Sequence, residues 1–276
     1  MNEHCGAVDG NQPSTAPCYW FVFRQDNVLL QRDFGGGVKV PLSVSPPATL
    51  KPGGTIHDVG AISGFRCLAA SAGADEPAQG YVYLPLRQSY AYLPYAFYGK
   101  AGKSHEILYW DLHTQYCGVC GEPMQLRTPI SKCCPQCGAE AWPSLSVAII
   151  VLIEKNDEVL LVQSRSFRGN YYGLVSGYVE TGETLEQCVH REVLEETALT
   201  IADLRYVGSQ VWPFPSTLMV AYRARYAGGC LQIQRDELRH GEWFRWNALP
   251  ALPGEDSIAR KMVEAWAHEQ SAKYAL

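Results

Sequence analysis

The segment from Gly177 to Leu199 constrains the fold of this chain more than any other, because it joins a glycine-containing turn to strong helix-start signals. Thr184, with Gln187 three residues later, has the spacing of a capping box, which predicts a helix that begins directly after Thr184. Apolar residues then recur at helical spacing, as expected for an amphipathic helix that packs on a core. The buried face of this helix is expected to contain Leu185, Val189 and Val193.

Three carboxylates are expected to share the opposite face of the same helix, because Glu192, Glu195 and Glu196 stand at positions i, i+3 and i+4. Carboxylates this close repel one another, so each resists ionising unless a cation lies among them. Hard oxygen ligands suit Mg²⁺ or Mn²⁺. The segment therefore predicts a divalent cation site, of the kind that supports attack on a pyrophosphate.

The spacing of these charged residues resembles the Nudix box, which reads G-x5-E-x7-R-E-U-x-E-E-x-G-U with U aliphatic. The chain supplies Gly177, Glu183 and Arg191 at the first three fixed positions, and every later charged position is also present. The alternative, an amphipathic helix with a solvated Glu/Arg face, does not account for so many spaced matches. Ala198 is the one departure, where the family has Gly. Gly at a helix end usually forms a left-handed cap, in which Ala costs about 1 kcal/mol, so the change affects the turn and not the ligands.

Five of the ten cysteines lie between Cys117 and Cys137, in two C-x-x-C knuckles and one extra position. Each knuckle turns the chain so that two thiolates face one ion, and two knuckles supply the tetrahedral four-thiolate set of a structural zinc site. Four thiolates leave no position for a catalytic water, so this zinc is expected to stabilise the structure and not to hydrolyse the substrate. The predicted ligands are Cys117, Cys120, Cys134 and Cys137, with Cys133 outside the set.

The length and the net charge of the chain limit the classes of protein to which it could belong. A chain of 276 residues with 47% hydrophobic residues fits two domains and a small module. The net charge of −5 argues against general binding to nucleic acid phosphates, so duplex DNA is not an expected partner. The longest apolar run, Val147 to Ile153, is too short to span a membrane, and no signal-like segment is apparent. Cys5, Cys18, Cys67, Cys188 and Cys230 are scattered as free thiols would be, which favours a cytoplasmic protein.

The expected domains are an N-terminal β-rich domain at 1–112, a four-Cys zinc ribbon at 113–143 and a catalytic domain at 144–276. Strands are predicted at 20–24, 27–31, 81–86, 147–154, 159–163 and 243–246, with a helix at 106–112. The segment 21–31 echoes 152–163 in its polar turn and Val-Leu-Leu return. Either the N-terminal domain is a duplicated fold without the chemistry, or two unrelated hairpins use the same turn residues.

Residues 209–217 read Ser-Gln-Val-Trp-Pro-Phe-Pro-Ser-Thr and are predicted to form a rigid extended loop that recognises a flat heterocycle. After a Nudix box and a four-Cys ribbon, this segment resembles the SQPWPFPxS signature of the NADH pyrophosphatase branch of the Nudix hydrolases. Val211 replaces the first Pro of that signature and Thr217 replaces its last Ser. The resemblance covers about residues 95 to 270.

The resemblance implies roles for individual residues. It assigns catalytic carboxylates to Glu195 and Glu196, without deciding which is the base. It assigns Mg²⁺ or Mn²⁺ ligands to Ser176 (through its carbonyl), Glu192, Glu195, Glu196 and Glu237. It assigns substrate contacts to Trp142, Tyr178, Gln210, Val211, Trp212, Pro213, Phe214, Pro215, Ser216, Thr217 and Ala259. Arg191 is expected to pair with a box carboxylate such as Glu183.

The resemblance also implies an α+β fold: a C-terminal Nudix α/β/α sandwich with a mixed sheet, a central zinc ribbon and the β-rich N-terminal domain. The expected activity is that of an NAD⁺ diphosphatase, which cleaves NADH or NAD⁺ to AMP and NMNH or NMN, and removes NAD caps from RNA 5′ ends. In this branch the aromatic at Trp142 comes from the partner subunit, which implies a homodimer. The alternatives are a pyrophosphatase for ADP-ribose or another nucleotide sugar, and a non-catalytic zinc-ribbon and Nudix ligand sensor.

Overall fold

The computed structural model describes residues 15–33, 35–167 and 169–274, which form two compact units. The first unit runs to Ser144 and includes Pro213–Ser216; the second contains Leu145–Trp212 and the residues from Thr217 onward. Cys5, predicted to be a free thiol, lies outside the described residues. Among the described residues, no helix combines the length and the apolar character needed to cross a membrane. The bounds of the three predicted domains stay predictions.

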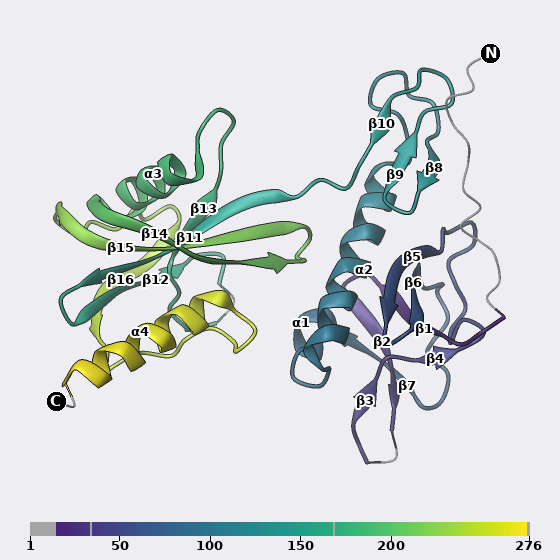
Figure 1. The fold of residues 1–276 in the computed structure, drawn as a ribbon, viewed down its shortest axis with the longest axis horizontal. Helices are drawn as coiled ribbons and strands as arrows, with labels where there is room; N and C mark the ends of the chain where they lie inside the picture. The colour runs from purple at the N-terminus through teal and green to yellow at the C-terminus, as the bar shows by residue number, and fades with distance from the viewer. Residues whose placement is uncertain (1–14, 34, 168, 275–276) are drawn as a thin grey trace. The chain divides into compact units, whose positions relative to one another are not determined.

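The first unit contains a seven-stranded sheet (Figure 1). Its strands are β1 (Cys18–Arg24), β2 (Asn27–Arg32), β3 (Val38–Lys39), β4 (Leu42–Ser43), β5 (His57–Ile62), β6 (Phe65–Ser71) and β7 (Tyr81–Pro85), followed by the helices α1 (Leu86–Ser89) and α2 (Tyr95–His113). Helix α2 is longer than the predicted helix at 106–112. Gly99 and Gly102 weaken the helix signal there, but burial of Tyr98 and Ala101 in the core stabilises the added turns.

A small three-stranded sheet carries the cysteine knuckles, with β8 (Gln125–Thr128), β9 (Ser131–Cys133) and β10 (Glu140–Ala141) in the order β10-β9-β8. Lys132 on β9 is 4% exposed. Its ammonium group lies 2.5 Å from the Asp111 carboxylate and donates to the carbonyls of Asp111 and Thr114 at 2.9 and 3.0 Å. The ribbon is thereby joined to the C-terminal end of α2 through a buried, fully hydrogen-bonded ammonium group.

The second unit contains a six-stranded mixed sheet in the order β14-β15-β11-β12-β16, with β13 paired to β11. Its elements are β11 (Ser146–Lys155), β12 (Glu158–Ser164), β13 (Val175–Tyr178), α3 (Leu185–Thr197), β14 (Leu199–Trp212), β15 (Thr217–Gly229), β16 (Leu238–Arg245) and α4 (Ile258–Tyr274). Helix α3 covers one face of this sheet and α4 covers the other (Figure 1).

The continuous apolar run of β11 is explained by burial on both faces of the sheet. Ile149, Val151 and Ile153 pack in the cluster that includes α3 residues. Ile150 and Leu152 alternate with them and pack in the cluster that includes α4 residues. The two helices are therefore held on opposite faces by one strand, and α3 packs against β11 and β13.

The two sheets share one topology. In the first unit β1 pairs parallel with β6 and antiparallel with β2, while β5 pairs with β6, β7 with β2 and β4 with β1. In the second unit the same pairings recur: β11 pairs parallel with β15 and antiparallel with β12, while β14 pairs with β15, β16 with β12 and β13 with β11. A helix follows the last strand in both. The residues between β4 and β5, however, form no helix where the second unit has α3. The first unit thus keeps the scaffold without the carboxylate helix.

The predicted extended loop at 209–217 is wrong in part, because most of it lies in two paired strands. Gln210 pairs with Met219 and Trp212 pairs with Thr217. Pro213–Ser216 alone form the turn between β14 and β15. The prolines lack the N–H that a strand ladder requires, so they are confined to the turn while their neighbours pair.

Ala198 ends α3 in the left-handed conformation, with φ 56° and ψ 23°, and its N–H donates to the Leu194 carbonyl. We expect Ala198→Gly to raise the free energy of unfolding by about 1 kcal/mol, because Gly adopts this conformation without a Cβ clash. Urea denaturation measures the change, and turnover should stay the same. Ala265→Gly, at an exposed position within α4, should instead lower stability by about 1 kcal/mol. Equal destabilisation by both variants would contradict the expectation.

Candidate active site

Helix α3 begins with the predicted capping box. The Gln187 N–H donates to the Thr184 hydroxyl at 3.2 Å, and the Thr184 N–H donates to the Gln187 side-chain oxygen at 2.7 Å. Two otherwise unpaired N–H groups are satisfied in this way, which defines the start of the helix and therefore the direction of every carboxylate on it.

The carboxylates of α3 lie in two different environments. The expectation that all three share a face opposite the apolar residues is wrong for Glu192 and Glu196, which are 8% and 5% exposed. Counted from the fully buried Val189, they occupy positions i+3 and i+7, so they point toward the sheet beside Val193. The side chain of Glu195 is 59% exposed. Only Glu195 therefore has free access to solvent.

Arg191 holds the carboxylates of the box in place. It forms a bidentate pair with Glu183, with Nη2 and Nε at 2.7 and 3.1 Å from its two oxygens. Its Nη1 donates to Glu192 at 2.8 Å and to Glu195 at 3.1 Å, and its Nη2 also donates to the Tyr178 carbonyl. The hydrogen bond from Arg191 lowers the pKa of Glu183 to about 2. The guanidinium thus acts as an internal counter-ion that orients side chains, as the sequence predicted for its pairing with Glu183.

Glu196 is a buried carboxyl without a matching cation. Its Oε2 has no hydrogen-bond partner among the described residues. Burial, followed by the charges of Glu192 and Glu237, raises the pKa of Glu196 to about 8. Burial also raises the pKa of Glu192, although Arg191 opposes that shift. A buried oxygen surrounded by carboxylates is the arrangement expected of a site that receives a hard cation.

Glu237 reaches this group through backbone contacts that the sequence did not indicate. The Gln234 N–H donates to the Glu196 carbonyl at 2.9 Å, and the Gln232 N–H donates to the Thr197 carbonyl at 3.0 Å. The Gln234 side-chain oxygen accepts from the Glu237 N–H at 2.9 Å. The segment before β16 is therefore docked on the last turn of α3, which places Glu237 beside Glu196. Gln234 is a positioning residue that sequence analysis missed, since no motif singles it out.

Gly177 lies against the carboxylate of Glu192. A Cβ at this position would come within 2.0 Å of the Glu192 carboxyl group, so no other residue fits without displacing it. Ser176, one residue earlier on β13, is partly exposed and pairs across the sheet with Ile150. The glycine therefore allows the carboxylate to approach the backbone of β13, where the Ser176 carbonyl lies.

The chemistry of the donor groups fits a divalent cation. Glu192, Glu196 and Glu237 supply three carboxylates, one oxygen of Glu196 is buried without a hydrogen-bond partner among the described residues, and Gly177 makes room for the Glu192 carboxylate. The carboxylate oxygens do not all lie within 4.8 Å of one another. Among the described residues, only the ligand atoms of the four cysteines are that close together. The ion pair with Arg191 holds Glu192 toward the guanidinium. Binding of a cation would have to compete with that pair.

The raised pKa of Glu196 predicts how stability depends on pH in the absence of a divalent cation. A carboxyl group whose pKa is higher in the folded than in the unfolded state contributes stability below its unfolded pKa of 4.5, and this contribution is lost as pH rises toward about 8. We expect the melting temperature in buffer without Mg²⁺ or Mn²⁺ to fall over this range. Thermal scans should show recovery when Mg²⁺ is added at the upper end. A fall of the same size in Glu196→Gln would contradict the assignment to Glu196.

The four cysteines of the knuckles meet at one point. The Sγ atoms of Cys117 and Cys137 are 3.6 Å apart, those of Cys120 and Cys134 are 3.4 Å apart, and those of Cys120 and Cys137 are 3.6 Å apart. Thiolates around one tetrahedral zinc at 2.3 Å lie about 3.8 Å from each other, so the cluster has the size of that site. Cys133 is buried outside it.

The predicted substrate residues are brought together only in part. Tyr178 is 58% exposed, and its hydroxyl lies 3.5 Å from the Thr217 hydroxyl. The Tyr178 carbonyl accepts a hydrogen bond from Arg191, the residue that binds the box carboxylates, so Tyr178 lies close to those carboxylates. Val211 is exposed and Trp212 is partly exposed, both at the end of β14. Tyr178 therefore offers an accessible aromatic ring next to the candidate metal ligands.

Gln210 and Ala259 have structural contacts that the sequence did not predict. The Gln210 amide donates to the Asp256 carbonyl at 2.6 Å and accepts from the Ile258 N–H at 2.7 Å, so it defines the start of α4. Ala259 is 4% exposed, and its side chain packs in the core under α4. Any substrate contact of Ala259 would therefore have to use its backbone. Trp142, Pro213, Phe214, Pro215 and Ser216 belong to the first unit, and Trp142 is 53% exposed.

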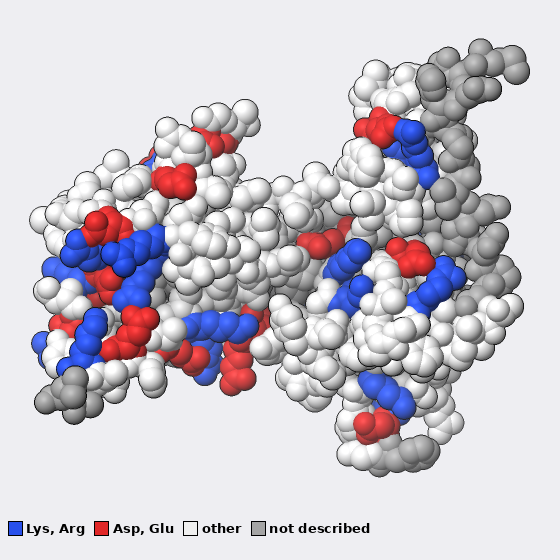
Figure 2. Space-filling model, in the orientation of Figure 1, with Lys and Arg blue, Asp and Glu red and all other residues white. Residues whose placement is uncertain are grey.

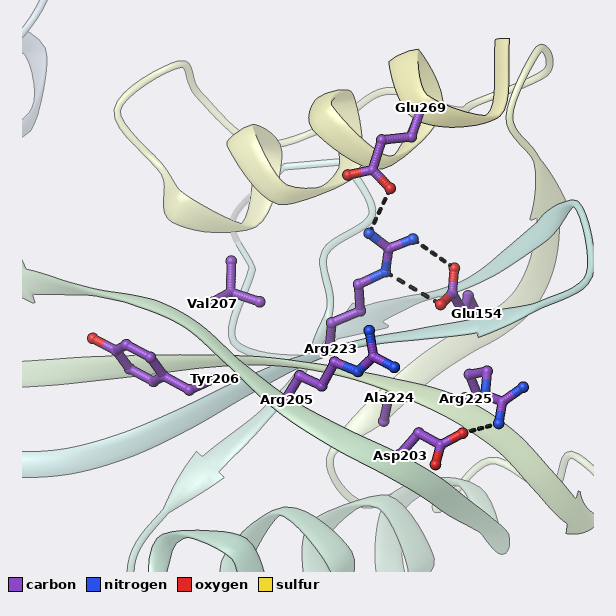
Figure 3. A pocket seen from close by; sticks show the side chains of 9 residues that line it. All are labelled: Glu154, Asp203, Arg205, Tyr206, Val207, Arg223, Ala224, Arg225 and Glu269. Atoms are coloured by element: carbon purple, nitrogen blue, oxygen red, sulfur yellow. Dashed lines mark hydrogen bonds and ion pairs between the residues drawn. The ribbon is translucent and has the colours of Figure 1, made fainter. Parts of the chain in front are cut away.

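A separate pocket of about 430 Å³ lies between β14, β15 and α4 in the second unit (Figure 3). Arg223 donates to both oxygens of Glu154 and to Glu269, and Arg225 pairs with Asp203. Arg205 lines this pocket without an ion pair among the described residues. Most charged side chains of this pocket form ion pairs, two between strands of the sheet and one between the sheet and α4. Its described lining residues include no metal-ligand cluster.

Two family models match the chain: the NUDIX domain at residues 143–266, and the NADH pyrophosphatase-like rudimentary NUDIX domain at residues 17–110. A NAD-capped RNA hydrolase NudC of Chromobacterium violaceum is 35% identical over 248 residues, which cover 90% of this chain and 91% of the relative. The chain belongs to the NADH pyrophosphatase branch of the Nudix hydrolases. The NudC of Pseudomonas aeruginosa LESB58 is 40% identical over 200 residues, or 71% of this chain and 72% of that protein.

The Nudix assignment also decides between the two interpretations of the N-terminal domain. The match to a rudimentary NUDIX domain and the shared strand pairing confirm a duplicated fold. The predicted α+β class with a C-terminal Nudix domain is confirmed as well. A solved Nudix hydrolase of Nitrosomonas europaea aligns with a TM-score of 0.48 and 21% identity, over 57% of this chain and 93% of its own; the assignment does not depend on it.

Proposed function

We propose that this Nudix hydrolase cleaves the diphosphate of NADH and NAD⁺ to AMP and NMNH or NMN, and removes NAD caps from RNA 5′ ends. The observation that carries the proposal is the buried Glu196 oxygen, which has no hydrogen-bond partner in the part of the chain that the structure describes and lies beside Glu192 and Glu237. Substrate class is supported by the names of the relatives, which are NAD-capped RNA hydrolases, and by the NADH pyrophosphatase-like domain at 17–110.

The proposed cation ligands are Glu192, Glu196 and Glu237 with the Ser176 carbonyl, and Glu195 completes the set at the exposed side. Mg²⁺ or Mn²⁺ bound there would neutralise charge that develops on the phosphates and acidify a water molecule. Zn²⁺ is proposed for Cys117, Cys120, Cys134 and Cys137.

The residues of the chain have separate parts in the reaction. The oxygen of water attacks one phosphorus, the bond from that phosphorus to the bridging oxygen breaks, and Glu195 or Glu196 accepts the proton of the water. Arg191 keeps Glu183 ionised and orients Glu192 and Glu195 during this step. Tyr178 offers a ring for stacking on a base of the substrate. The proposed contacts at Gln210 and Val211 through Thr217, and at Ala259, would shape the rest of the pocket.

We propose that the protein acts as a homodimer in the cytoplasm. Trp142 supports the dimer, because this large aromatic side chain is 53% exposed at a position where the family takes an aromatic residue from the partner subunit. Free thiols at Cys67, Cys188 and Cys230 suit a reducing compartment. Light scattering on the purified protein tests the dimer, and Trp142→Ala should then raise KM for NADH more than it lowers kcat.

Product analysis tests the proposed activity. NADH, NAD⁺, ADP-ribose and NAD-capped RNA are compared side by side with Mg²⁺ and with Mn²⁺. We expect AMP from NADH and NAD⁺, and a 5′-monophosphate RNA from the capped RNA. A kcat/KM higher for ADP-ribose than for NADH would favour a nucleotide-sugar pyrophosphatase instead. Tight binding without any metal-dependent product would favour a ligand sensor.

A further inference from the structure

The second unit contains arginines whose charge is not matched by a carboxylate. Most of its described arginines form ion pairs, as Arg191, Arg223, Arg225, Arg245 and Arg260 do. Within the described residues of this unit, the arginines without an ion pair are Arg165, Arg205, Arg235 and Arg239. Three of these four gather at one place, which we call the arginine rim: Arg165, Arg235 and Arg239.

The arginine rim is ordered by hydrogen bonds to neutral groups. Arg165 Nε donates to the Arg235 carbonyl at 2.6 Å, and Arg239 Nη2 donates to the Arg165 carbonyl at 2.9 Å. Arg239 also donates to the Phe167 carbonyl at 2.9 Å. Carbonyl oxygens accept hydrogen bonds without cancelling the positive charge, and all three arginines are exposed. The rim therefore keeps donors and charge available to an anion.

The rim lies directly beside the candidate metal site. The Arg165 N–H donates to the Glu237 carbonyl at 2.8 Å, and Ser164 pairs with Leu238 across β12 and β16. Arg235 and Arg239 flank Glu237 in the sequence at two residues on each side. One proposed cation ligand thus accepts a backbone hydrogen bond from one rim residue and lies two residues from each of the other two, with Asp236 as the other exposed carboxylate in that segment.

The charge of the rim is local. The face shown in Figure 2 carries Lys, Arg, Asp and Glu in small interspersed groups on both units, without a continuous field of one sign. The net charge of the whole chain is −5. A polyanion would therefore be attracted at particular places and not along the entire protein.

On the basis of the proposed function, we propose that the arginine rim binds the phosphates of the first nucleotides of a single-stranded RNA whose NAD cap occupies the active site. Both phosphates of NADH lie at the bond that is cleaved. A capped RNA carries an additional phosphate for every nucleotide that follows, so its chain leaves the metal site as a polyanion. Guanidinium groups bind such phosphates by charge-assisted hydrogen bonds.

The test compares two substrates in the full-length, zinc-loaded protein with Mg²⁺. Arg165→Ala, Arg235→Ala and the double variant remove rim charges. Arg205→Ala is the matched control, because Arg205 is also exposed and outside any ion pair among the described residues, but lies on β14, at the opposite edge of the sheet from β16. For NAD-capped RNA, we expect kcat/KM of the double variant to fall about 10-fold, while Arg205→Ala stays within about 2-fold of the wild type. For NADH, every variant should stay within about 2-fold of the wild type.

Salt dependence of the wild-type protein provides a second readout that does not rely on any variant folding. The logarithm of kcat/KM should fall more steeply with the logarithm of salt concentration for capped RNA than for NADH, and each rim substitution should reduce the slope by about 0.7. Equal losses on both substrates, an equal loss in Arg205→Ala, or identical salt slopes for the two substrates would overturn the rim proposal. A wild-type protein that cleaves neither substrate would instead refute the proposed function on which the rim proposal rests.

Discussion

Glu196→Gln is expected to lower kcat for both NADH and NAD-capped RNA by about 1000-fold or more. The variant keeps the shape of the side chain but removes a negative charge from the buried group formed with Glu192 and Glu237, and it removes a candidate proton acceptor. Steady-state kinetics with saturating Mg²⁺ measures the loss. Zinc content and circular dichroism should equal those of the wild type.

The stability of Glu196→Gln separates a lost charge from a damaged fold. Because the buried carboxylate is repelled by its neighbours, the variant should be at least as stable as the wild type at about pH 8 without a divalent cation. Glu186→Gln is the matched control, since Glu186 is exposed in the first turn of the same helix and stays outside the carboxylate group. Glu195→Gln changes an exposed side chain and should lower kcat less than Glu196→Gln does. Near-normal turnover by Glu196→Gln would refute the site.

Cys134→Ser is expected to remove the zinc and to unfold the ribbon, because the three short strands bury too little apolar surface to fold without a metal. Apparent binding free energies of structural zinc sites are about 10–16 kcal/mol, so the loss should exceed the stability of the module. Metal analysis should show one zinc per chain in the wild type and none in the variant. Limited proteolysis should then cut between residues 114 and 143.

Loss of the ribbon should also loosen the end of α2, because Lys132 joins β9 to Asp111 and Thr114. Hydrogen exchange at the C-terminal turn of α2 reports that change. Cys230→Ser, an exposed free thiol outside the ribbon, should leave zinc content and proteolysis unchanged. A Cys134→Ser protein that retains one zinc per chain would contradict the four-thiolate assignment.

Local signals predicted the site-bearing helix well. The capping box at Thr184 and Gln187, the pairing of Arg191 with Glu183, and the left-handed cap at Ala198 all depend on residues within one helix and its two ends. The paired C-x-x-C knuckles likewise predicted four cysteines that meet. Hydrogen bonds over short sequence distances leave few alternatives, so residue spacing is sufficient to infer them.

Contacts between segments far apart in the sequence explain where the structure differs from the predictions. The sheet on which α3 packs decides that Glu192 and Glu196 are buried and Glu195 is exposed. Pairing with β15 draws most of 209–217 into strand β14, and packing on the first sheet extends α2 beyond the predicted helix. Each of these outcomes depends on a partner segment far away in the sequence, which periodicity alone does not identify.

The sequence by itself determined the chemistry of this protein: a carboxylate helix that needs a cation, a four-thiolate ribbon, and a family that acts on nicotinamide dinucleotides. Tertiary structure decided which groups meet. The docking of Gln234 on the Glu196 carbonyl brings Glu237 to the helix, and the pairing of β12 with β16 gathers Arg165, Arg235 and Arg239 around it. The physical reason is that spacing along one helix follows from covalent geometry, whereas a site assembled from several strands exists only after their backbone groups have paired.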